Sequence, residues 1–356
     1  MEKIISFTRG IPPDESFPKE KLAECASTAI LKNGSQTLQY ASAAGYEPLR
    51  DWIAEECKTA REKVLIGQGS ILLLDFFIHS NLNPNDLVFV EQPSYDRSLT
   101  LFKRAGIRLK GFSLVNGEID MDEVEAALSS GLRPKAFYVI PDFQNPSGAL
   151  MPKTHRKKLL NLADQYNFLI IEDGPYRHLR YSGNALEQLV EINPSRVVLM
   201  SSFSKMVSPG LRVGYMIAPA EITASICQYA ENSYINASHL NQAIIYNFIL
   251  NGWMDDHISS LLTIYKSRLA AMLGALRICM AERGTWLEPE GGFFVGLSLN
   301  SGFHIPNAQQ CSEAGIVLTN SNGFFLSGGE NFIRLPFCAL TPEKIEAGIE
   351  RLAKII

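Results

Sequence analysis

The sequence predicts an α/β fold, with a mostly parallel sheet of seven strands in a large domain and a smaller α/β domain. Through residues 64–218, short apolar runs alternate with segments of helical pattern. Several runs are apolar throughout, which is typical of strands covered by helices on both faces. The chain has 356 residues, enough for two domains. We expect a large domain at 46–255 and a small domain formed by 1–45 and 256–356.

Each expected strand is a short apolar run, such as Leu87-Val88-Phe89-Val90, and helical patterns lie between these runs. The strands are expected at 64–67, 86–91, 107–113, 136–140, 168–172, 197–201 and 213–218. The helices are expected at 70–80, 95–105, 122–129 and 153–166. From about residue 220 the pattern turns helical, with little glycine or proline at 221–250 and 254–283. Short strands at 292–299 and 332–335 and a last helix from Pro342 complete the smaller domain.

Composition limits the classes of function. The net charge is −4 and no basic stripe occurs, so we expect no binding to nucleic acid or to an anionic membrane. The N-terminal residues lack the apolar core of a signal peptide, and the apolar runs are too short to span a bilayer. Six scattered cysteines without a C-x-x-C pair favour a reduced, cytoplasmic protein, and six dispersed histidines favour no metal site.

The segment 201–212 is the most informative in the chain. Ser202 and Ser204 precede Lys205, and Arg212 follows seven residues after the lysine. A lysine amine attacks carbonyls only when neutral, and its ordinary pKa of about 10.4 keeps it protonated, so a site must adapt to use it. The two hydroxyls and the arginine suit a phosphate beside an aldehyde bonded to Lys205. Pyridoxal phosphate (PLP) is the cofactor that carries both groups.

This segment alone leaves other interpretations open. Ser202-Phe203-Ser204-Lys205 also fits the S-x-x-K pattern of serine acyl-enzymes, but the S-D-N and K-T-G elements that accompany it are absent. A solvated loop with one lysine fits the Ser-Lys pair about as well. The rest of the chain decides between these interpretations.

Other polar residues fit the remaining parts of the same cofactor. Gly69-Ser70 follows a strand and opens a helix, whose free N–H groups would bind a phosphate. Asn145 could donate to an aromatic oxygen, Asp173 could pair with a protonated pyridine nitrogen, and Tyr95 could stack on a ring. Taken singly, these residues also fit a tight turn, an Asn-Pro turn and an acid at a strand end.

The order of these residues carries more weight than any one of them. All of them follow the carboxyl ends of expected strands, where an open α/β sheet forms its ligand crevice. The residues in question are Gly69-Ser70, Tyr95, Asn145, Asp173, Tyr176, Lys205 and Arg212. Together they account for the phosphate, ring nitrogen, ring oxygen, ring face and aldehyde of PLP.

On these motifs the chain resembles the PLP-dependent aminotransferases of fold type I, class I/II. The nearest branch comprises the 2-aminoadipate (LysN-like) aminotransferases and the aminotransferase-like half of MocR-type regulators. The resemblance runs from Phe7 to about Leu352. It rests on the segments 7–13, 38–50, 143–148, 172–176, 201–214 and 332–335.

The resemblance implies a role for each site residue. Lys205 would bond the cofactor aldehyde and move the substrate proton, with Asp173 at the ring nitrogen. Asn145 and Tyr176 would hydrogen-bond the ring oxygen, and Tyr95 would stack on the ring. The phosphate contacts would come from Ser70, Ile71, Ser202, Ser204 and Arg212.

Three further residues are implied at the subunit boundary and at the substrate. Tyr40 would reach the phosphate of a neighbouring subunit, which implies a homodimer with shared active sites. Arg334 would bind the substrate α-carboxylate in a two-point fork, and Gly10 would lie beside the substrate.

Three departures from the family pattern concern the cofactor and the substrate entrance. Relatives usually have Gly-Ser-Gln-Gln where this chain has Gly69-Ser70-Ile71-Leu72, so Ile71 supplies no side-chain amide. Arg9 stands where a small residue is usual. The stretch between Leu299 and Gly315 is short. These changes bear on phosphate binding and on the choice of substrate.

The expected function is transfer of an amino group from an L-amino acid to a 2-oxo acid, with 2-oxoglutarate as the acceptor by family habit. A PLP-dependent decarboxylase, lyase or oxidase is an alternative, motivated by the changed entrance. A non-catalytic PLP-sensing module, as in MocR regulators, is a third. Those regulators carry an N-terminal DNA-binding domain for which this chain has no room, and the net charge of −4 disfavours DNA binding.

Overall fold

The computed structural model describes residues 4–356 and contains a central eight-stranded sheet in the order β2-β9-β8-β7-β6-β3-β4-β5. The strands are β2 (Val64–Gly67), β3 (Leu87–Gln92), β4 (Arg108–Val115), β5 (Glu118–Ile119), β6 (Ala136–Val139), β7 (Leu169–Asp173), β8 (Val197–Ser202) and β9 (Gly214–Ile217). Strands β4, β3, β6, β7 and β8 run parallel, and β9 is antiparallel to both β8 and β2. The prediction of a mostly parallel α/β sheet is therefore confirmed.

The sheet has one strand more than the expected seven. The extra strand, β5, has two residues and pairs antiparallel with the end of β4. Asn116 and Gly117, which lie between them, both have positive φ, at 52° and 84°, and so form a tight hairpin turn. A two-residue strand is too short to show a hydrophobic period, and this is why the sequence did not predict it.

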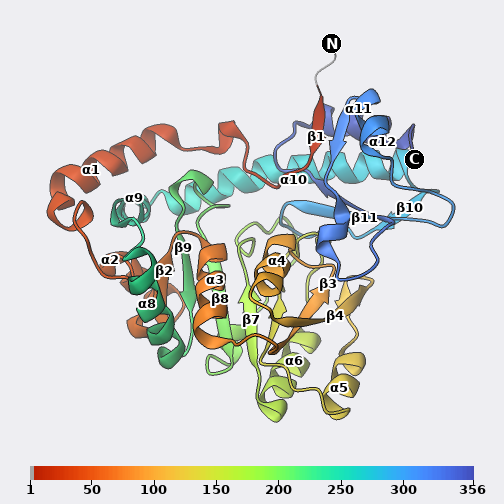
Figure 1. Cartoon of the computed structure of the whole chain (residues 1–356). Helices are drawn as coiled ribbons and strands as arrows, with labels where there is room; N and C mark the ends of the chain where they lie inside the picture. The colour runs from red at the N-terminus through yellow and green to blue at the C-terminus, as the bar shows by residue number, and fades with distance from the viewer. Residues whose placement is uncertain (1–3) are drawn as a thin grey trace.

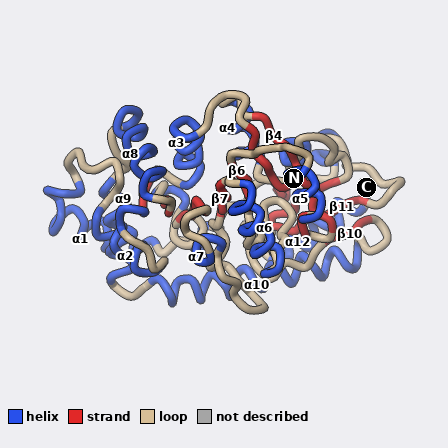
Figure 2. Tube along the Cα trace, turned by 90° about the horizontal axis from the view of Figure 1, so that it is seen from below, coloured by secondary structure: helices blue, strands red, loops and turns tan. Residues whose placement is uncertain are grey.

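Helices cover both faces of the sheet, as expected for strands that are apolar throughout. One face is covered by α3 (Ser70–Asn81), α4 (Asp96–Arg104) and α8 (Ala220–Tyr234). The other is covered by α2 (Glu47–Glu56), α5 (Met121–Ser129), α6 (Lys153–Tyr166), α7 (Leu189–Ile192) and α9 (His239–Leu250). Figure 2 shows α3, α4 and α8 on one side of the strands and α2, α6 and α7 on the other.

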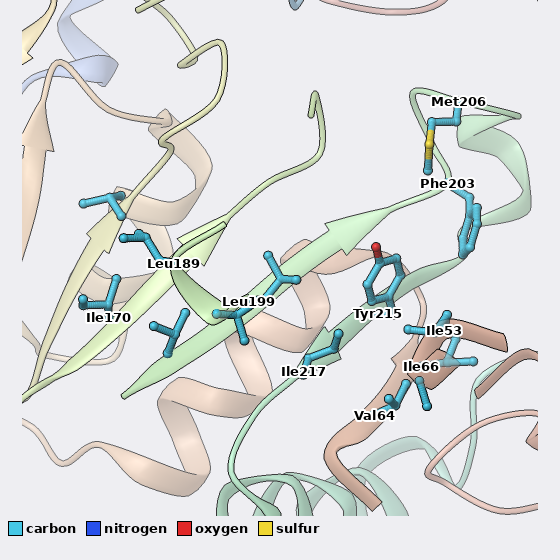
Figure 3. Close-up of a cluster of buried hydrophobic side chains, with 14 of the residues drawn as sticks. Ile53, Val64, Ile66, Ile170, Leu189, Leu199, Phe203, Met206, Tyr215 and Ile217 are labelled. Carbon is cyan, nitrogen blue, oxygen red and sulfur yellow. The ribbon is translucent and has the colours of Figure 1, made fainter. Parts of the chain in front are cut away.

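The hydrophobic core between the sheet and the helices α2, α5, α6, α7 and α9 fixes the turn that follows β8. Phe203 and Met206 are buried and pack in one cluster with Tyr215, Ile53 and Ile66 (Figure 3). Phe203 lies with its ring centroid 5.8 Å from that of Tyr215. These anchors lie on either side of residues 204 and 205, so the turn is held in place by apolar burial.

Two small sheets lie in the part of the chain outside the central sheet and form the core there. Strands β10 (Gly284–Trp286), β11 (Phe294–Leu299) and β13 (Phe332–Pro336) are antiparallel, while β1 (Ile5–Phe7) pairs parallel with β12 (Ile316–Leu318). They pack with α10 (Met254–Cys279), α11 (Ala308–Glu313) and α12 (Pro342–Ala353) in a separate hydrophobic cluster. In Figure 1, β1 and the C-terminal elements gather at one end of the molecule.

We propose a division into a large and a small domain on the basis of these separate cores. One boundary differs from the expected one. Helix α1 (Lys19–Thr37) packs against α9, and its residues Cys25 and Ala29 are buried in the large-domain core. We therefore place α1 with the large domain, although residues 1–45 were assigned to the small domain by sequence.

The long helices at 221–250 and 254–283 were predicted too long. The first is two helices, α8 and α9, because Ile235 has φ 71° and a new helix begins after Ser238, whose Oγ accepts from the Asn241 N–H at 3.3 Å. The second, α10, ends at Cys279. Among the described residues, no helix combines the length and apolarity needed to cross a membrane.

Candidate active site

A cavity of about 150 Å³ opens at the carboxyl ends of the parallel strands and brings most of the predicted site residues together. Ten residues of its lining were singled out from sequence: Ser70, Ile71, Tyr95, Asn145, Asp173, Tyr176, Ser202, Ser204, Lys205 and Arg212. The lining also contains Ile140, Pro175 and Pro209, which carry no signal that distinguishes them from ordinary apolar and turn residues. Tyr40, Gly10 and Arg334 lie outside this lining.

Lys205 lies in the turn after β8, between the anchors Phe203 and Met206. Its Nζ donates to the carbonyl of Gly10 at 2.9 Å and lies 5.6 Å from the centroid of the Phe293 ring. Burial lowers the pKa of Lys205 from its ordinary value of 10.5, because a buried ammonium loses its hydration. The shift is in the direction of the neutral amine, which is the form that attacks a carbonyl.

Asp173, the last residue of β7, has one carboxylate oxygen bound and one free. Its Oδ2 accepts from the Tyr138 hydroxyl at 2.5 Å, while Oδ1 is buried with no hydrogen-bond partner in the part of the chain that the structure describes. Burial raises the pKa of Asp173 to about 6, and the Tyr138 hydrogen bond and Lys205 both oppose that rise. A buried acceptor without a partner is costly, and a protonated ring nitrogen in the cavity would satisfy it.

The opposite end of the cavity forms a cradle for an anion. Helix α3 begins here after Gly69, whose φ is 86°, and a Cβ at this position would lie 2.3 Å from Nη2 of Arg212. A Cβ at Gly214 would lie 2.5 Å from the Ser70 nitrogen. Glycine at these two positions lets the helix N-terminus and the guanidinium face the same space, which suits a phosphate.

Ser202, Ser204 and Arg212 complete this cradle. Ser202 Oγ donates to Ser204 Oγ at 2.8 Å, and Arg212 Nη2 donates to the Gln68 carbonyl at 3.1 Å. No carboxylate pairs with Arg212 among residues 4–356. Ile71 lines the same end and offers only an apolar side chain.

Asn145 joins the cofactor end of the cavity to Arg334. Its Oδ1 accepts from Arg334 Nη1 at 3.1 Å, which leaves the amide N–H groups of Asn145 as donors. The loop that carries it is fixed by the buried Arg156, which donates to Asp142 Oδ1 at 2.7 Å and to the Met151 carbonyl at 3.0 Å. Asn145 is therefore held by contacts on both sides.

Tyr95 and Tyr176 contribute phenol groups to the cavity wall. Tyr95 is the residue before α4, and burial raises its pKa to about 12. Burial raises the pKa of Tyr176 well above its ordinary value. Both hydroxyls are therefore neutral hydrogen-bond donors near pH 7.

Arg334 is a buried guanidinium without a carboxylate partner among the described residues. It lies between the rings of Phe294 and Phe324, with its Cζ at 4.9 and 4.6 Å from their centroids. Nη2 donates to the Thr8 carbonyl at 2.7 Å, and Nε is buried with no partner in the described chain. Such a cation favours an incoming carboxylate, because burial without a counter-charge is costly.

The N-terminal segment 8–10 closes this side of the cavity. Gly10 lies against Phe294 so closely that a Cβ would be 2.3 Å from the ring atom Cζ. The carbonyls of Thr8 and Gly10 contact Arg334 and Lys205, as described above. By contrast, Tyr40 is 77% exposed in the loop after α1.

Sequence reasoning missed several residues that hold the predicted ones in place. Phe293, Phe294 and Phe324 pack around Lys205 and Arg334, and Tyr138 binds Asp173. The only available signal was a tyrosine within the apolar run of β6, which is also what an ordinary buried strand contains. No group of histidine, cysteine, aspartate and glutamate that could hold a metal ion occurs in residues 4–356.

Comparison with known proteins connects this geometry to a family. The chain matches the model of the family "Aminotransferase class I and II" over residues 2–352. It is 32% identical to aromatic-amino-acid aminotransferase 1 of Thermococcus litoralis, covering 99% of this chain and 88% of the relative. It is also 32% identical to 2-aminoadipate transaminase of Thermus thermophilus, covering 99% of this chain and 90% of that protein.

A solved structure agrees with the sequence comparisons. The structure of LysN, the alpha-aminoadipate aminotransferase of Thermus thermophilus, complexed with N-(5'-phosphopyridoxyl)-L-leucine, superposes with a TM-score of 0.93. The identity is 32%, and the alignment covers 99% of this chain and 92% of that one. The chain described here therefore belongs to the aminotransferase class I and II family.

Proposed function

We propose that this aminotransferase uses PLP to move the amino group of an L-amino acid to a 2-oxo acid, with 2-oxoglutarate as the acceptor. The observation that carries the proposal is the pairing of two groups in one cavity. Lys205 has a lowered pKa, and Asp173 presents a buried oxygen without a partner in the described chain. A lysine amine and a free carboxylate oxygen are what the aldehyde and the ring nitrogen of PLP require.

Each part of the cofactor has residues that would hold it. The cradle at the start of α3 would bind the phosphate through Ser70, Ser202, Ser204 and Arg212. Asp173 would accept a hydrogen bond from the ring nitrogen, and Tyr95 would cover the ring face. Asn145 and Tyr176 would donate to the ring oxygen.

PLP, when bound, supplies an electron sink that acidifies the Cα–H bond of an attached amino acid. The protein's own task is then proton transfer and exclusion of water. Lys205 Nζ would take the proton from the substrate Cα and deliver it to the carbon of the cofactor's aldehyde group. Burial, which lowers its pKa, and the nearby Phe293 ring suit a general base, because only the neutral amine can accept a proton.

Arg334 would bind the substrate α-carboxylate. Its fork-shaped donors can bind two carboxylate oxygens at once. Nη2 is now bonded to the Thr8 carbonyl, so the carboxylate would compete with that bond or share it. The names of the relatives make aromatic amino acids and 2-aminoadipate the first donors to test, since one relative is an aromatic-amino-acid aminotransferase and another a 2-aminoadipate transaminase.

We also propose a homodimer in which Tyr40 reaches the phosphate cradle of the second subunit. Leu31, Leu38 and Tyr40 are between 63% and 81% exposed on α1 and the loop that follows it. Apolar side chains gathered on one segment favour burial in an interface. A cytoplasmic location is part of the proposal and is supported by the cysteines, which are all unpaired in the described chain.

The proposal is tested by an assay of the purified protein with PLP, 2-oxoglutarate and a panel of amino acids. We expect glutamate to form only with PLP present and only with certain donors. Glutamate formation that is independent of PLP, or absence of glutamate with every donor, would contradict the proposal. Omitting 2-oxoglutarate is the matched control, because the acceptor is then missing while the donor and cofactor remain.

A further inference from the structure

Tyr138 contacts Asp173 from a position where the neighbouring strand residues are apolar. It lies within β6, and its hydroxyl donates to Asp173 Oδ2 at 2.5 Å while accepting from Ser98 Oγ at 3.0 Å. Tyr138 and Ser98 are fully buried, and Asp173 is nearly so. The three residues form a dry chain of hydrogen bonds that ends at the cavity.

The strand register explains why Tyr138 reaches Asp173. Tyr138 pairs with Ile171 of β7, and Asp173 is two residues further along on the same face of the sheet. Side chains on such diagonal positions are within reach of a tyrosine. The contact is therefore built into the pairing of β6 with β7.

Helix α4 fixes the direction of the Tyr138 hydroxyl. Phe102 packs its ring edge-on against that of Tyr138, at 6.0 Å between centroids and 72° between planes. Ser98 lies one helical turn before Phe102 and so faces the same ring. The aromatic contact holds the ring, and the serine holds the hydroxyl hydrogen towards Asp173.

This arrangement acts on both the orientation and the charge of Asp173. With Oδ2 occupied by Tyr138, the carboxylate keeps Oδ1 as its free oxygen in the described chain. Burial favours the neutral acid, and the two contributions that oppose it are the Tyr138 hydrogen bond and the charge of Lys205. The charge of Asp173 acts in turn on Glu91 and Tyr95, since it adds to the burial that raises the pKa of each.

We propose that Tyr138 and Ser98 are positioning residues of the active site, which keep Asp173 ionised with Oδ1 directed at the pyridine nitrogen of the cofactor. The inference rests on the proposed use of PLP. It differs from a packing role in one respect that can be measured. Loss of the hydroxyl should matter only for a ligand that has a ring nitrogen.

The experiment compares the affinity of the cofactor-free protein for PLP and for 1-deaza-PLP, in which C–H replaces the ring nitrogen. We expect Tyr138→Phe to weaken PLP binding by roughly 10- to 100-fold, the range of a hydrogen bond to a charged group. Ser98→Ala should weaken it by a few-fold. Neither change should alter the affinity for 1-deaza-PLP.

Tyr215→Phe is the matched control. Tyr215 is a buried tyrosine of β9, and it lies in the core on the other face of the sheet. This change should leave both affinities as they are. A second readout is the ¹⁵N resonance of PLP labelled at the ring nitrogen, which in Tyr138→Phe should move towards the unprotonated value.

If Tyr138→Phe weakened the binding of PLP and of 1-deaza-PLP equally, the proposal would be overturned, and Tyr138 would have a packing role instead. Unchanged PLP affinity together with an unchanged ¹⁵N resonance would overturn it as well. If the wild-type protein bound neither ligand, the proposed function itself would fail, which is a separate result. Thermal unfolding of each variant shows whether it is folded, and Ser98→Ala carries the test if Tyr138→Phe is not.

Discussion

The two ends of the active site are built in different ways. The cofactor end comes from residues at consecutive strand ends of one sheet, and its polar side chains bind one another, as Ser202 binds Ser204 and Tyr138 binds Asp173. The substrate end is assembled from segments far apart in the chain, since Arg334 donates to Thr8, 326 residues away. The first is organised by sheet topology, and the second depends on how the small domain and the N-terminal segment pack.

The difference explains what each end is prepared to bind. At the cofactor end, Asp173 Oδ1 is buried without a partner in the described chain, and the start of α3 faces the same cavity as Arg212. At the substrate end, Arg334 Nη2 is already bonded to the Thr8 carbonyl, and only Nε is buried without a partner in the described chain. We infer that the cofactor enters a preformed site, whereas the substrate competes with protein contacts.

Lys205 is where the two ends meet, so its replacement should have the largest effect. Lys205→Ala should lower turnover by at least about 10⁴-fold, because both the bond to the aldehyde and the proton transfer are lost. PLP should still bind non-covalently through the cradle and Asp173. Rates and retention of PLP on dialysis are the measurements, with the surface change Lys103→Ala as control. Undiminished turnover would rule out the role of Lys205.

The cofactor end should make the cofactor-free protein sensitive to pH. Burial raises the pKa of Glu91 from 4.5 to about 8, in a site where it accepts from the Ile140 N–H at 2.9 Å. The folded protein therefore holds a proton that the unfolded chain releases. The stability that this proton provides is complete below about pH 4.5 and is lost as pH rises through about 8.

Denaturant unfolding across this pH range measures the effect. The free energy of unfolding should fall by a few kcal/mol between about pH 5 and 8. Glu91→Gln should reduce that dependence, because the glutamine does not titrate, while Asp173, whose pKa burial raises to about 6, still does. A wild-type protein that gains stability as pH rises over the same window would show that Glu91 is ionised in the folded state.

Arg334→Lys should affect the substrate end alone. A lysine cannot bind two carboxylate oxygens in the same plane, so KM should rise roughly 10- to 100-fold for every amino acid donor. PLP affinity should stay as in the wild type. Steady-state kinetics over several donors is the measurement, and the control is Arg196→Lys, at a half-buried arginine paired with Asp164 outside the active site. A loss confined to acidic donors would mean that Arg334 binds the distal group instead.

Ile71→Gln should have the smallest effect and belongs to the cofactor end. Added to the cradle, a side-chain amide could donate one hydrogen bond to the phosphate, so PLP affinity should rise by a few-fold to about tenfold. KM for donors should not change. Equilibrium titration of the cofactor-free protein with PLP tests this, and weaker binding would show that the apolar contacts of Ile71 matter more than the missing amide.

Sequence pattern alone indicated more of the residues that line the cavity than of the residues around Arg334, for a physical reason. Lys205, Asp173 and Asn145 follow apolar runs, and parallel strands bring their carboxyl ends to one edge whatever the detail of packing. Arg334 and Gly10 could be assigned only by resemblance, because their contacts join segments with no local pattern in common. The aromatic rings around Arg334 likewise come from separate turns and strands.

Other differences come from local backbone geometry that side-chain periodicity does not report. The helix expected at 221–250 is interrupted where Ile235 takes a positive φ. Tyr138 looks like one more apolar residue of β6, and only the register with β7 reveals that its hydroxyl meets Asp173. The packing of α1 against α9 also depends on tertiary contacts, which the sequence pattern does not contain.

The most direct test of the central claim is a single-turnover spectrum of the purified PLP-bound protein, recorded while one amino acid is added without any oxo acid. We predict that the yellow colour is lost in proportion to the number of subunits and that one 2-oxo acid forms per subunit. Adding 2-oxoglutarate should then restore the colour. Continued product formation without an acceptor, or a colour that no amino acid changes, would contradict the assignment of this chain as an aminotransferase.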